Sequence, residues 1–313
     1  MTRKLTRVLG FLLGLAVFLI ALSVLRRELS DGRIDDVVGH AADISAEKLV
    51  IAVFFTIASF LVLTGYDNLS LRYIRHPLPY RRTALASFIN YAFSQGLGFP
   101  LLTGGSVRYR LYTRWGLSAV QITQLVVFAS ATFWLGVLTL AGIVFVIAPP
   151  GIARVLPVAG WIIRPVGIVM LSVVAAYAWW TLTGLKLLRL WSWRLRRPAP
   201  RLAALQLAVA CADWVMASAV LFVLMPAEAG LLFPAFLAIF LLAFVAGIIS
   251  HVPAGLGVFE TVIILLLPPS APEAAVLGAL LVYRGVYYLL PLLVAVVLLA
   301  GHEVLVRRKG DAA

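Results

Sequence analysis

Two charged residues lie inside long apolar stretches, where water cannot solvate them. Asp213 lies eleven residues into the stretch 202–225, and Arg284 lies ten residues into the stretch 274–301. A charge at the centre of a bilayer costs at least about 2.5–3.5 kcal/mol, so each residue is a candidate functional group. The planar guanidinium of arginine suits a phosphate or a carboxylate. Arg284 is therefore predicted to hold a phosphate or to pair with Glu260 or Asp213.

Other candidate side chains accompany these charges. Glu260 opens a short apolar run, where the helix dipole favours a carboxylate, and it could alternatively contact a cationic group or a proton. His251 is either a pH-sensitive group or a hydrogen-bonded buried histidine. Tyr287 and Tyr288 follow Arg284 on much the same helical face. These residues predict a binding site rather than a catalytic one.

Two acidic residues have simpler interpretations. Asp213 is flanked by small residues, so its face is expected to pack against other helices, and a structural ion pair or hydrogen bond is the alternative to a functional role. Asp67 is interpreted as a residue of the membrane interface. The two carboxylates of Asp213 and Glu260 outnumber the guanidinium of Arg284, so the charged residues within the apolar stretches carry one net negative charge. This charge weakly favours a cationic or zwitterionic group in the cargo.

The composition of the chain indicates that these apolar stretches lie in a lipid bilayer. Of the 313 residues, 63% are hydrophobic and 12% are charged, whereas soluble domains carry about 45–50% and about 25%. The net charge is +13, but the basic residues cluster between apolar stretches, which argues against nucleic-acid binding. Cys211 is the single cysteine, so neither a disulfide framework nor a thiol metal site is expected. We predict one all-α polytopic membrane domain over residues 1–313.

About seven or eight membrane spans are expected, because a spanning helix needs about 20 apolar residues. The candidate spans are 8–25, 49–66, 119–148, 166–185, 202–225, 231–250 and 274–301. Most of the 26 basic residues fall in one alternating set of loops, which includes the basic loop 186–201. The positive-inside rule therefore predicts cytoplasmic loops there and both termini in the cytoplasm. Residues 31–47 have helical apolar spacing and are expected to lie on the outer leaflet or to pack on the bundle.

Two apolar segments are interrupted by glycine and proline. Residues 83–105 lie between two basic loops, so they must enter and leave by the same face, and residues 251–272 enter from the opposite face. The predicted hinges of these re-entrant segments are Gly96, Gly98, Pro100, Pro253, Gly255 and Gly257. Paired broken segments of this kind are typical of transporters built from inverted repeats.

These motifs carry a resemblance to a known family. The first runs from Asn90-Tyr91-Ala92-Phe93 to Arg108-Tyr109-Arg110, the second is His251-Val252-Pro253-Ala254-Gly255-Leu256-Gly257-Val258-Phe259-Glu260, and the third is Tyr283-Arg284-Gly285-Val286-Tyr287-Tyr288. Together they resemble the lysylphosphatidylglycerol synthase transmembrane family, which is also described as flippase-like. The resemblance implies functional charges at Arg108, Glu260 and Arg284, and it implies nothing for Asp213.

The resemblance implies translocation of a phospholipid or an aminoacylated lipid between leaflets of the cell membrane. In well-known members a cytoplasmic aminoacyl-transferase domain follows the membrane region, whereas this chain ends at Ala313, so a separate transferase is a possible partner. The alternative is a membrane subunit or enzyme that acts with such a partner on lipid-linked substrates. No esterase, zinc-protease or phosphate-loop motif is found, so we expect no enzymatic activity, cofactor or metal, and membrane lipids as partners.

Overall fold

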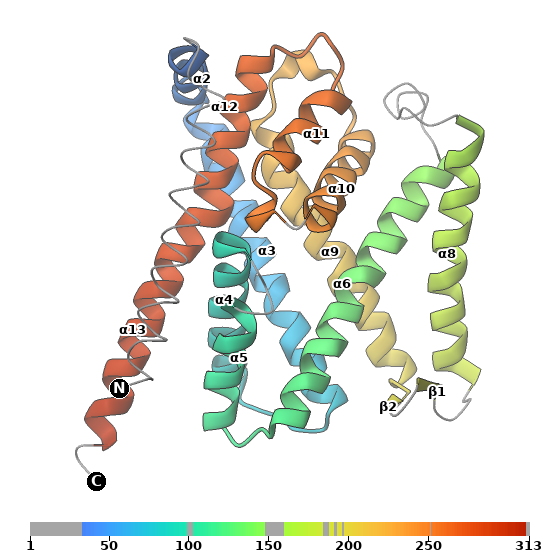
Figure 1. Cartoon of the computed structure of the whole chain (residues 1–313), viewed down its shortest axis with the longest axis vertical. Helices are drawn as coiled ribbons and strands as arrows, with labels where there is room; N and C mark the ends of the chain where they lie inside the picture. The colour runs from blue at the N-terminus through green and yellow to red at the C-terminus, as the bar shows by residue number, and fades with distance from the viewer. Residues whose placement is uncertain are drawn as a thin grey trace.

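Long apolar helices that run along one common axis make up most of the computed structural model (Figure 1). The structure describes residues 33–98, 103–147, 160–183, 188–190, 193–195, 197–250 and 252–310. Five described helical stretches are long and apolar enough to cross a membrane, namely Ala46–Tyr73, Ala119–Ile147, Trp161–Thr183, Pro200–Leu224 and Glu273–His302. The predicted all-α polytopic membrane fold is confirmed, and the candidate span 8–25 lies outside the described residues.

In the first half of the chain, a re-entrant hairpin lies between two long helices. The described elements are α2 (Arg33–Ala42), α3 (Ala46–Tyr73), α4 (Tyr80–Leu97), α5 (Thr103–Arg114) and α6 (Ala119–Ile147). Helix α3 descends to the lower end of Figure 1, α4 rises about half-way, α5 returns to the lower end, and α6 rises again. The predicted re-entrant segment 83–105 falls within this α4–α5 hairpin.

The second half repeats this pattern with the opposite direction. Its elements are α8 (Gly160–Thr183), β1 (Leu188–Leu190), β2 (Trp193–Leu195), α9 (Pro200–Leu224), η1 (Ala227–Ala229), α10 (Phe233–Ile249), η2 (Pro253–Gly255), α11 (Val258–Leu266), α12 (Glu273–Tyr283), η3 (Arg284–Leu289) and α13 (Leu290–Gly310). Helix α9 rises, α10 and α11 form a hairpin that enters from the upper end, and α12 descends through η3 into α13 (Figure 1). The arrangement has the form of an inverted repeat.

The segment 231–250 is not a complete span, although its composition placed it among the candidates. Helix α10 has 17 residues and is followed by η2 and α11, which return to the upper end (Figure 1). At 1.5 Å per residue, α10 is about 25 Å long, shorter than the hydrocarbon core of about 30 Å. The second re-entrant element is therefore α10–α11, which begins earlier along the chain than the predicted segment 251–272.

Backbone chemistry explains where the helices break. Helix α4 ends at Gly98, whose φ of 70° is readily adopted only by glycine. The stretch from Arg284 to Leu289 is a π-helix, and Pro291 lies just beyond it. Proline cannot donate the next helical hydrogen bond, so it favours a local change of helical pitch. Such a π-segment often marks a functional site, and this one begins at a predicted site residue.

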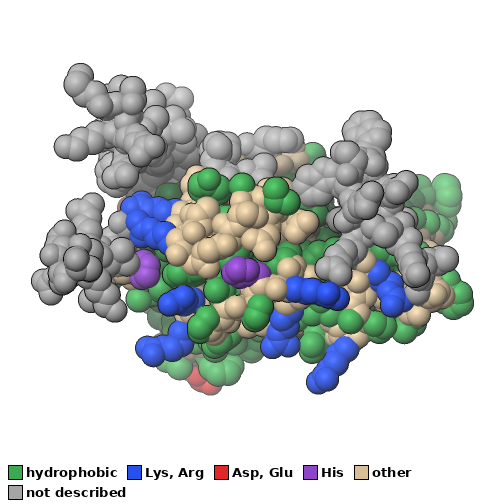
Figure 2. All heavy atoms as spheres, turned by 90° about the horizontal axis from the view of Figure 1, so that it is seen from below, with side chains coloured by type: hydrophobic (Ala, Val, Ile, Leu, Met, Phe, Trp, Pro, Cys, Tyr) green, Lys and Arg blue, Asp and Glu red, His purple; other side chains and the backbone are tan. Residues whose placement is uncertain are grey.

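The two ends of the molecule differ in charge. The lower end carries exposed arginines and little acidic surface, as Figure 2 shows from below. They include Arg72, Arg75, Arg81, Arg82, Arg110, Arg114, Arg197 and Arg201. The upper end carries the exposed acidic residues Asp35, Asp36, Asp43, Glu47, Glu228 and Glu273. The basic loops that the sequence assigned to one side of the membrane thus lie at one end of the structure.

Helix α2 packs on the bundle. Its apolar side is anchored by Val37, which is 3% exposed, while Asp35 and Asp36 face outward. The contact is close, because a Cβ atom on Gly278 of α12 would lie 3.0 Å from both the Val37 carbonyl oxygen and the Ala41 nitrogen. The sequence allowed this helix either to lie on the outer leaflet or to pack on the bundle, and the structure shows it packed on the bundle.

Candidate functional site

A buried ion pair fastens the first re-entrant hairpin to α3. Arg108 of α5 approaches Asp67 of α3 with an Nη2–Oδ1 distance of 2.5 Å, and Asp67 is completely buried. The hydroxyl of Tyr112 donates to the other carboxylate oxygen at 2.7 Å. The Arg108 guanidinium also donates to the Tyr91 hydroxyl at 3.0 Å and lies 5.1 Å from the centre of that ring. Hydrogen bonds and a counterion therefore compensate for the burial of both charges.

A second ion pair lies beside the second hairpin. Arg284 places Nη2 2.6 Å and Nε 2.8 Å from Oε1 of Glu260 in α11. The other Glu260 oxygen accepts the Gly257 backbone N–H at 2.8 Å, so this carboxylate also caps α11. Arg284 Nη1 donates to the Ala254 carbonyl oxygen at 3.0 Å. The guanidinium therefore connects the π-segment to the tip of the hairpin and to the helix that follows it.

Asp213 lies in the bundle, where its described partners are hydroxyl groups. It is 7% exposed, and its oxygens accept hydrogen bonds from Tyr66 at 2.8 Å and from Ser59 at 3.3 Å. Ser59 has one proton, which it donates to Asp213, so the Tyr287 hydroxyl donates to the Ser59 oxygen across 2.9 Å. Within the described residues no basic side chain forms an ion pair with Asp213. It differs in this respect from Asp67 and Glu260, each of which pairs with an arginine.

Aromatic side chains join these three groups into one continuous polar seam. The rings of Tyr66 and Tyr91 meet edge to face with centroids 5.8 Å apart, which connects Asp213 to the Arg108 pair. On the other side, Tyr287 contacts Tyr288, whose ring lies 4.6 Å from the Arg284 guanidinium carbon. The polar seam comprises Ser59, Tyr66, Asp67, Tyr91, Arg108, Tyr112, Asp213, Glu260, Arg284, Tyr287 and Tyr288. It contains three carboxylates and two guanidinium groups.

The tips of the two hairpins meet beside this seam. A Cβ atom on Gly98 would lie 2.5 Å from the backbone nitrogen of Ala254 and 3.2 Å from Cα of Pro253. Ala254 has a φ of 53°, which is unfavourable for a residue with a side chain, and its carbonyl oxygen is the one that Arg284 holds. Non-helical backbone is tolerated at membrane depth where protein buries it, and here each tip covers the other.

The structure brings most of the predicted site residues together. Arg108, Asp213, Glu260, Arg284, Tyr287 and Tyr288 all belong to the polar seam. Of the predicted hinges, Gly98, Gly255 and Gly257 have positive φ angles, Pro253 lies in η2, and Gly96 lies within α4. His251 and Pro100 lie outside the described residues. Of the two carboxylates proposed for Arg284, Glu260 is its partner and Asp213 is not.

Sequence reasoning missed several members of the seam. Asp67, which the sequence placed at the membrane interface, is completely buried on the inner side of the single helix Ala46–Tyr73 and is the counterion of Arg108. Ser59 and Tyr66 lie seven residues apart and therefore project from the same face of that helix. The sequence contained a signal that could have identified Asp67. A buried Arg108 requires a counterion, and Asp67 is the one acidic residue between Glu47 and Asp213.

Comparisons with known proteins identify relatives over almost the whole chain. The sequence model of the lysylphosphatidylglycerol synthase transmembrane region matches residues 7–295. An uncharacterised Synechocystis protein, slr0712, is 36% identical over 307 residues, which cover 98% of this chain and 95% of that protein. The inner membrane protein YbhN of Escherichia coli is 34% identical over 284 residues, which cover 87% of this chain and 86% of that protein.

A longer relative matches over the same region. A phosphatidylglycerol lysyltransferase of Staphylococcus aureus is 26% identical over 303 residues, which cover 94% of this chain and 34% of that protein. This chain thus spans about a third of the length of the lysyltransferase. The match over residues 7–295, together with the two full-length relatives, is sufficient to assign the family. The chain is a member of the lysylphosphatidylglycerol synthase transmembrane region family.

Proposed function

We propose that this protein translocates a phospholipid between the two leaflets of a bilayer, with the headgroup passing along the polar seam. The observation that carries the proposal is the position of this seam. Buried charges and hydroxyls from both halves of the chain meet where two re-entrant tips contact each other, inside an otherwise apolar bundle. A headgroup cannot cross about 30 Å of hydrocarbon unaided, so a translocase must provide such a polar route.

The charges of the seam favour a headgroup with a positive group. Both arginines are already paired with carboxylates, whereas Asp213 receives only hydroxyl hydrogen bonds in the described structure. An ammonium group could therefore approach Asp213 without first displacing a cation. The lipid phosphate would exchange with a carboxylate on Arg108 or Arg284, since guanidinium binds both groups in the same geometry. A zwitterionic or aminoacylated phospholipid meets both requirements.

Passage also requires a movement of the hairpins. In the described structure the tips are in backbone contact at Gly98 and Ala254, and the seam residues are closely packed. We therefore assign this structure to a closed state, and translocation would separate the tips. The basic lower end would face the cytoplasm by the positive-inside rule, in the same kind of inner membrane that the name of the Escherichia coli relative states.

Lipid movement in proteoliposomes tests the proposal. Purified protein would be reconstituted with leaflet-reporting anionic, zwitterionic and aminoacylated lipids, beside Asp213→Asn, Glu260→Gln and the exposed control Glu228→Gln. We expect exchange between leaflets with the wild type and the control, and at least a tenfold loss with either seam variant. If wild-type vesicles match empty vesicles for every lipid, with and without a membrane potential or pH gradient, the proposal is wrong.

A second candidate function rests on the length of one relative. A phosphatidylglycerol lysyltransferase contains a region similar to this chain, and this favours a membrane subunit or enzyme that acts with a partner transferase on lipid-linked substrates. Deletion of the gene followed by mass spectrometry of total membrane lipids distinguishes the two functions. Loss of an aminoacylated lipid from the whole membrane supports the subunit. An unchanged lipid inventory with an altered distribution between leaflets supports the translocase.

A further inference from the structure

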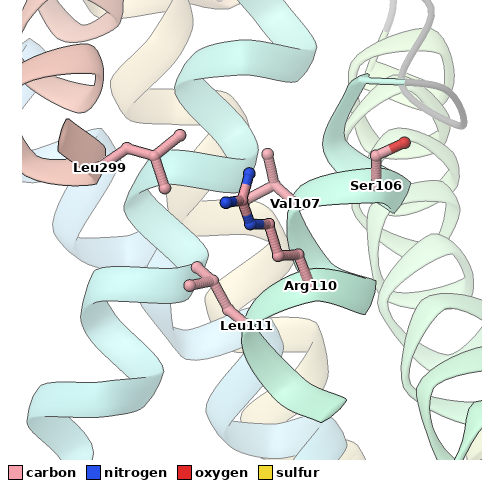
Figure 3. A pocket seen from close by; sticks show the side chains of 5 residues that line it. All are labelled: Ser106, Val107, Arg110, Leu111 and Leu299. Carbon is pink, nitrogen blue, oxygen red and sulfur yellow. The ribbon is translucent and has the colours of Figure 1, made fainter. Parts of the chain in front are cut away.

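A small hollow lies on the flank of the first re-entrant hairpin, between α5 and α13 (Figure 3). It encloses about 110 Å³ and is lined by Ser106, Val107, Arg110 and Leu111 of α5 and by Leu299 of α13. Successive helical residues are turned by about 100°, so Arg110 and Arg108 point in nearly opposite directions from α5. The hairpin thus separates this hollow from the ion pair that Arg108 forms with Asp67.

The lining is apolar at its base and cationic at its edge. Leu111 is completely buried, whereas Arg110 and Ser106 are exposed. Figure 3 shows the Arg110 guanidinium extending over the hollow between Val107 and Leu299. An apolar floor beneath a guanidinium matches a molecule that has a hydrocarbon chain and an anionic group.

The depth of the hollow matches a phospholipid in the adjoining leaflet. Arg110 lies one turn before the end of α5, which places it about 6 Å inside the basic lower end. Val107 lies about 4–5 Å deeper on the same helix. Further arginines at this end, including Arg82 and Arg114, are exposed and attract anionic lipid to the surface. A phosphate at the level of Arg110 would direct an acyl chain along Val107 and Leu299.

We propose that this hollow binds one anionic phospholipid from the leaflet at the basic end, with the phosphate on Arg110 and an acyl chain across Val107, Leu111 and Leu299. The small volume accommodates a short length of chain, and the rest of the lipid remains in the bilayer. The inference goes beyond the proposed function and does not depend on it, since the lipid bound here is anionic, whereas the proposed cargo carries a positive group.

Photo-crosslinking tests the site directly. Wild-type protein in phosphatidylcholine vesicles would be irradiated with a small fraction of phosphatidylglycerol that carries a diazirine in one acyl chain. We expect crosslinks concentrated within 103–114 and 290–302, and at least threefold fewer when the diazirine lipid is phosphatidylcholine. Arg110→Gln and the space-filling Ser106→Phe should each lower labelling at least threefold. Arg110→Lys should restore part of it, and the exposed control Arg201→Gln should leave it unchanged.

Three results would overturn the inference. The first is equal labelling by the two lipids. The second is labelling that survives both Arg110→Gln and Ser106→Phe. The third is competition by millimolar inorganic phosphate, which would indicate a phosphate site without a lipid. Each variant would first be compared with the wild type by size-exclusion chromatography. Translocation would be measured on the same vesicles. Labelling without translocation would refute the proposed function alone, and translocation without labelling would refute this site alone.

Discussion

Gly98 lies so close to Ala254 that a single added carbon would collide with it, since a Cβ atom on Gly98 would be 2.5 Å from the Ala254 nitrogen. The two residues belong to hairpins that enter the bundle from opposite ends. Their contact is formed by backbone, which cannot rotate away as a side chain can. The tips therefore hold each other in place, and neither can change its conformation without displacing the other.

This contact predicts a large effect of Gly98→Ala. A positive φ alone costs a residue with a side chain about 1–2 kcal/mol, and the collision with Ala254 adds to that cost. Gly116→Ala is the matched control, because Gly116 also has a positive φ, 90°, but a Cβ atom there meets nothing within 4 Å. Unfolding in mixed micelles should show a larger loss of stability for Gly98→Ala. Equal losses would mean that the tips do not restrain each other.

The ion pair of Asp67 and Arg108 predicts a second effect on stability. Asp67→Asn leaves the Arg108 guanidinium buried without a counterion, which typically costs about 3–5 kcal/mol. The double variant Asp67→Asn, Arg108→Met removes the stranded charge and should recover much of that loss. Equilibrium unfolding of both variants checks this, with the exposed Asp36→Asn as control. A double variant that is no more stable than Asp67→Asn would show that the charge is not the cause.

Asp213→Asn, in contrast to Asp67→Asn, should lower lipid translocation and leave stability nearly unchanged. An asparagine can still accept the Tyr66 hydrogen bond through its oxygen and can donate to the Ser59 oxygen through its amide nitrogen, and no described cation loses its partner. The free energy of unfolding should therefore change by no more than about 1 kcal/mol, while lipid translocation falls at least tenfold. Parallel measurements of unfolding and lipid exchange test both parts. A loss of stability comparable to that of Asp67→Asn would assign Asp213 a structural role.

Helix α2 offers a test of packing at the other end of the molecule. Gly278→Leu would place a side chain where Gly278 now meets Val37 and Ala41, so α2 should be displaced from α12. The variant Val37→Cys, made in a Cys211→Ala background, would show displacement of α2 as faster maleimide labelling of the new thiol. Val37 is 3% exposed, and labelling should rise several-fold in the Gly278→Leu variant. Gly301→Leu is the control, because nothing lies within 4 Å of its Cβ position.

The sequence predicted the outline of the fold because the bilayer imposes simple rules. Apolar length identified the helices, and the position of the basic loops required the segment around Gly96 and Gly98 to return to its own side. The same rules could only place residues 231–250 among the candidate spans, because hydropathy does not distinguish a half-length helix covered by protein from a complete span. The turn at Pro253 was recognised, but not that α10 belongs to the same hairpin.

The candidate site was predictable only in part, for a related reason. Charged residues within apolar stretches are conspicuous, so Asp213, Glu260 and Arg284 were identified directly. Their neighbours Ser59, Tyr66 and Tyr91 are ordinary in membrane helices, and they become part of the site only through contacts between helices distant in sequence. Asp67 was not recognised as part of the site because helix α3 continues beyond the apolar run that defined it in the sequence.

The contact between Gly98 and Ala254 also bears on how the protein is made. About half of the chain separates the two residues, so the first hairpin leaves the ribosome well before the surface that covers its tip. At synthesis rates of about 5–20 residues per second, the interval is about 10–30 s. During this time the exposed backbone around Gly98 must be shielded by lipid headgroups, water or the insertion machinery. Biogenesis of this fold therefore includes a waiting period that ends when α10 and α11 are inserted.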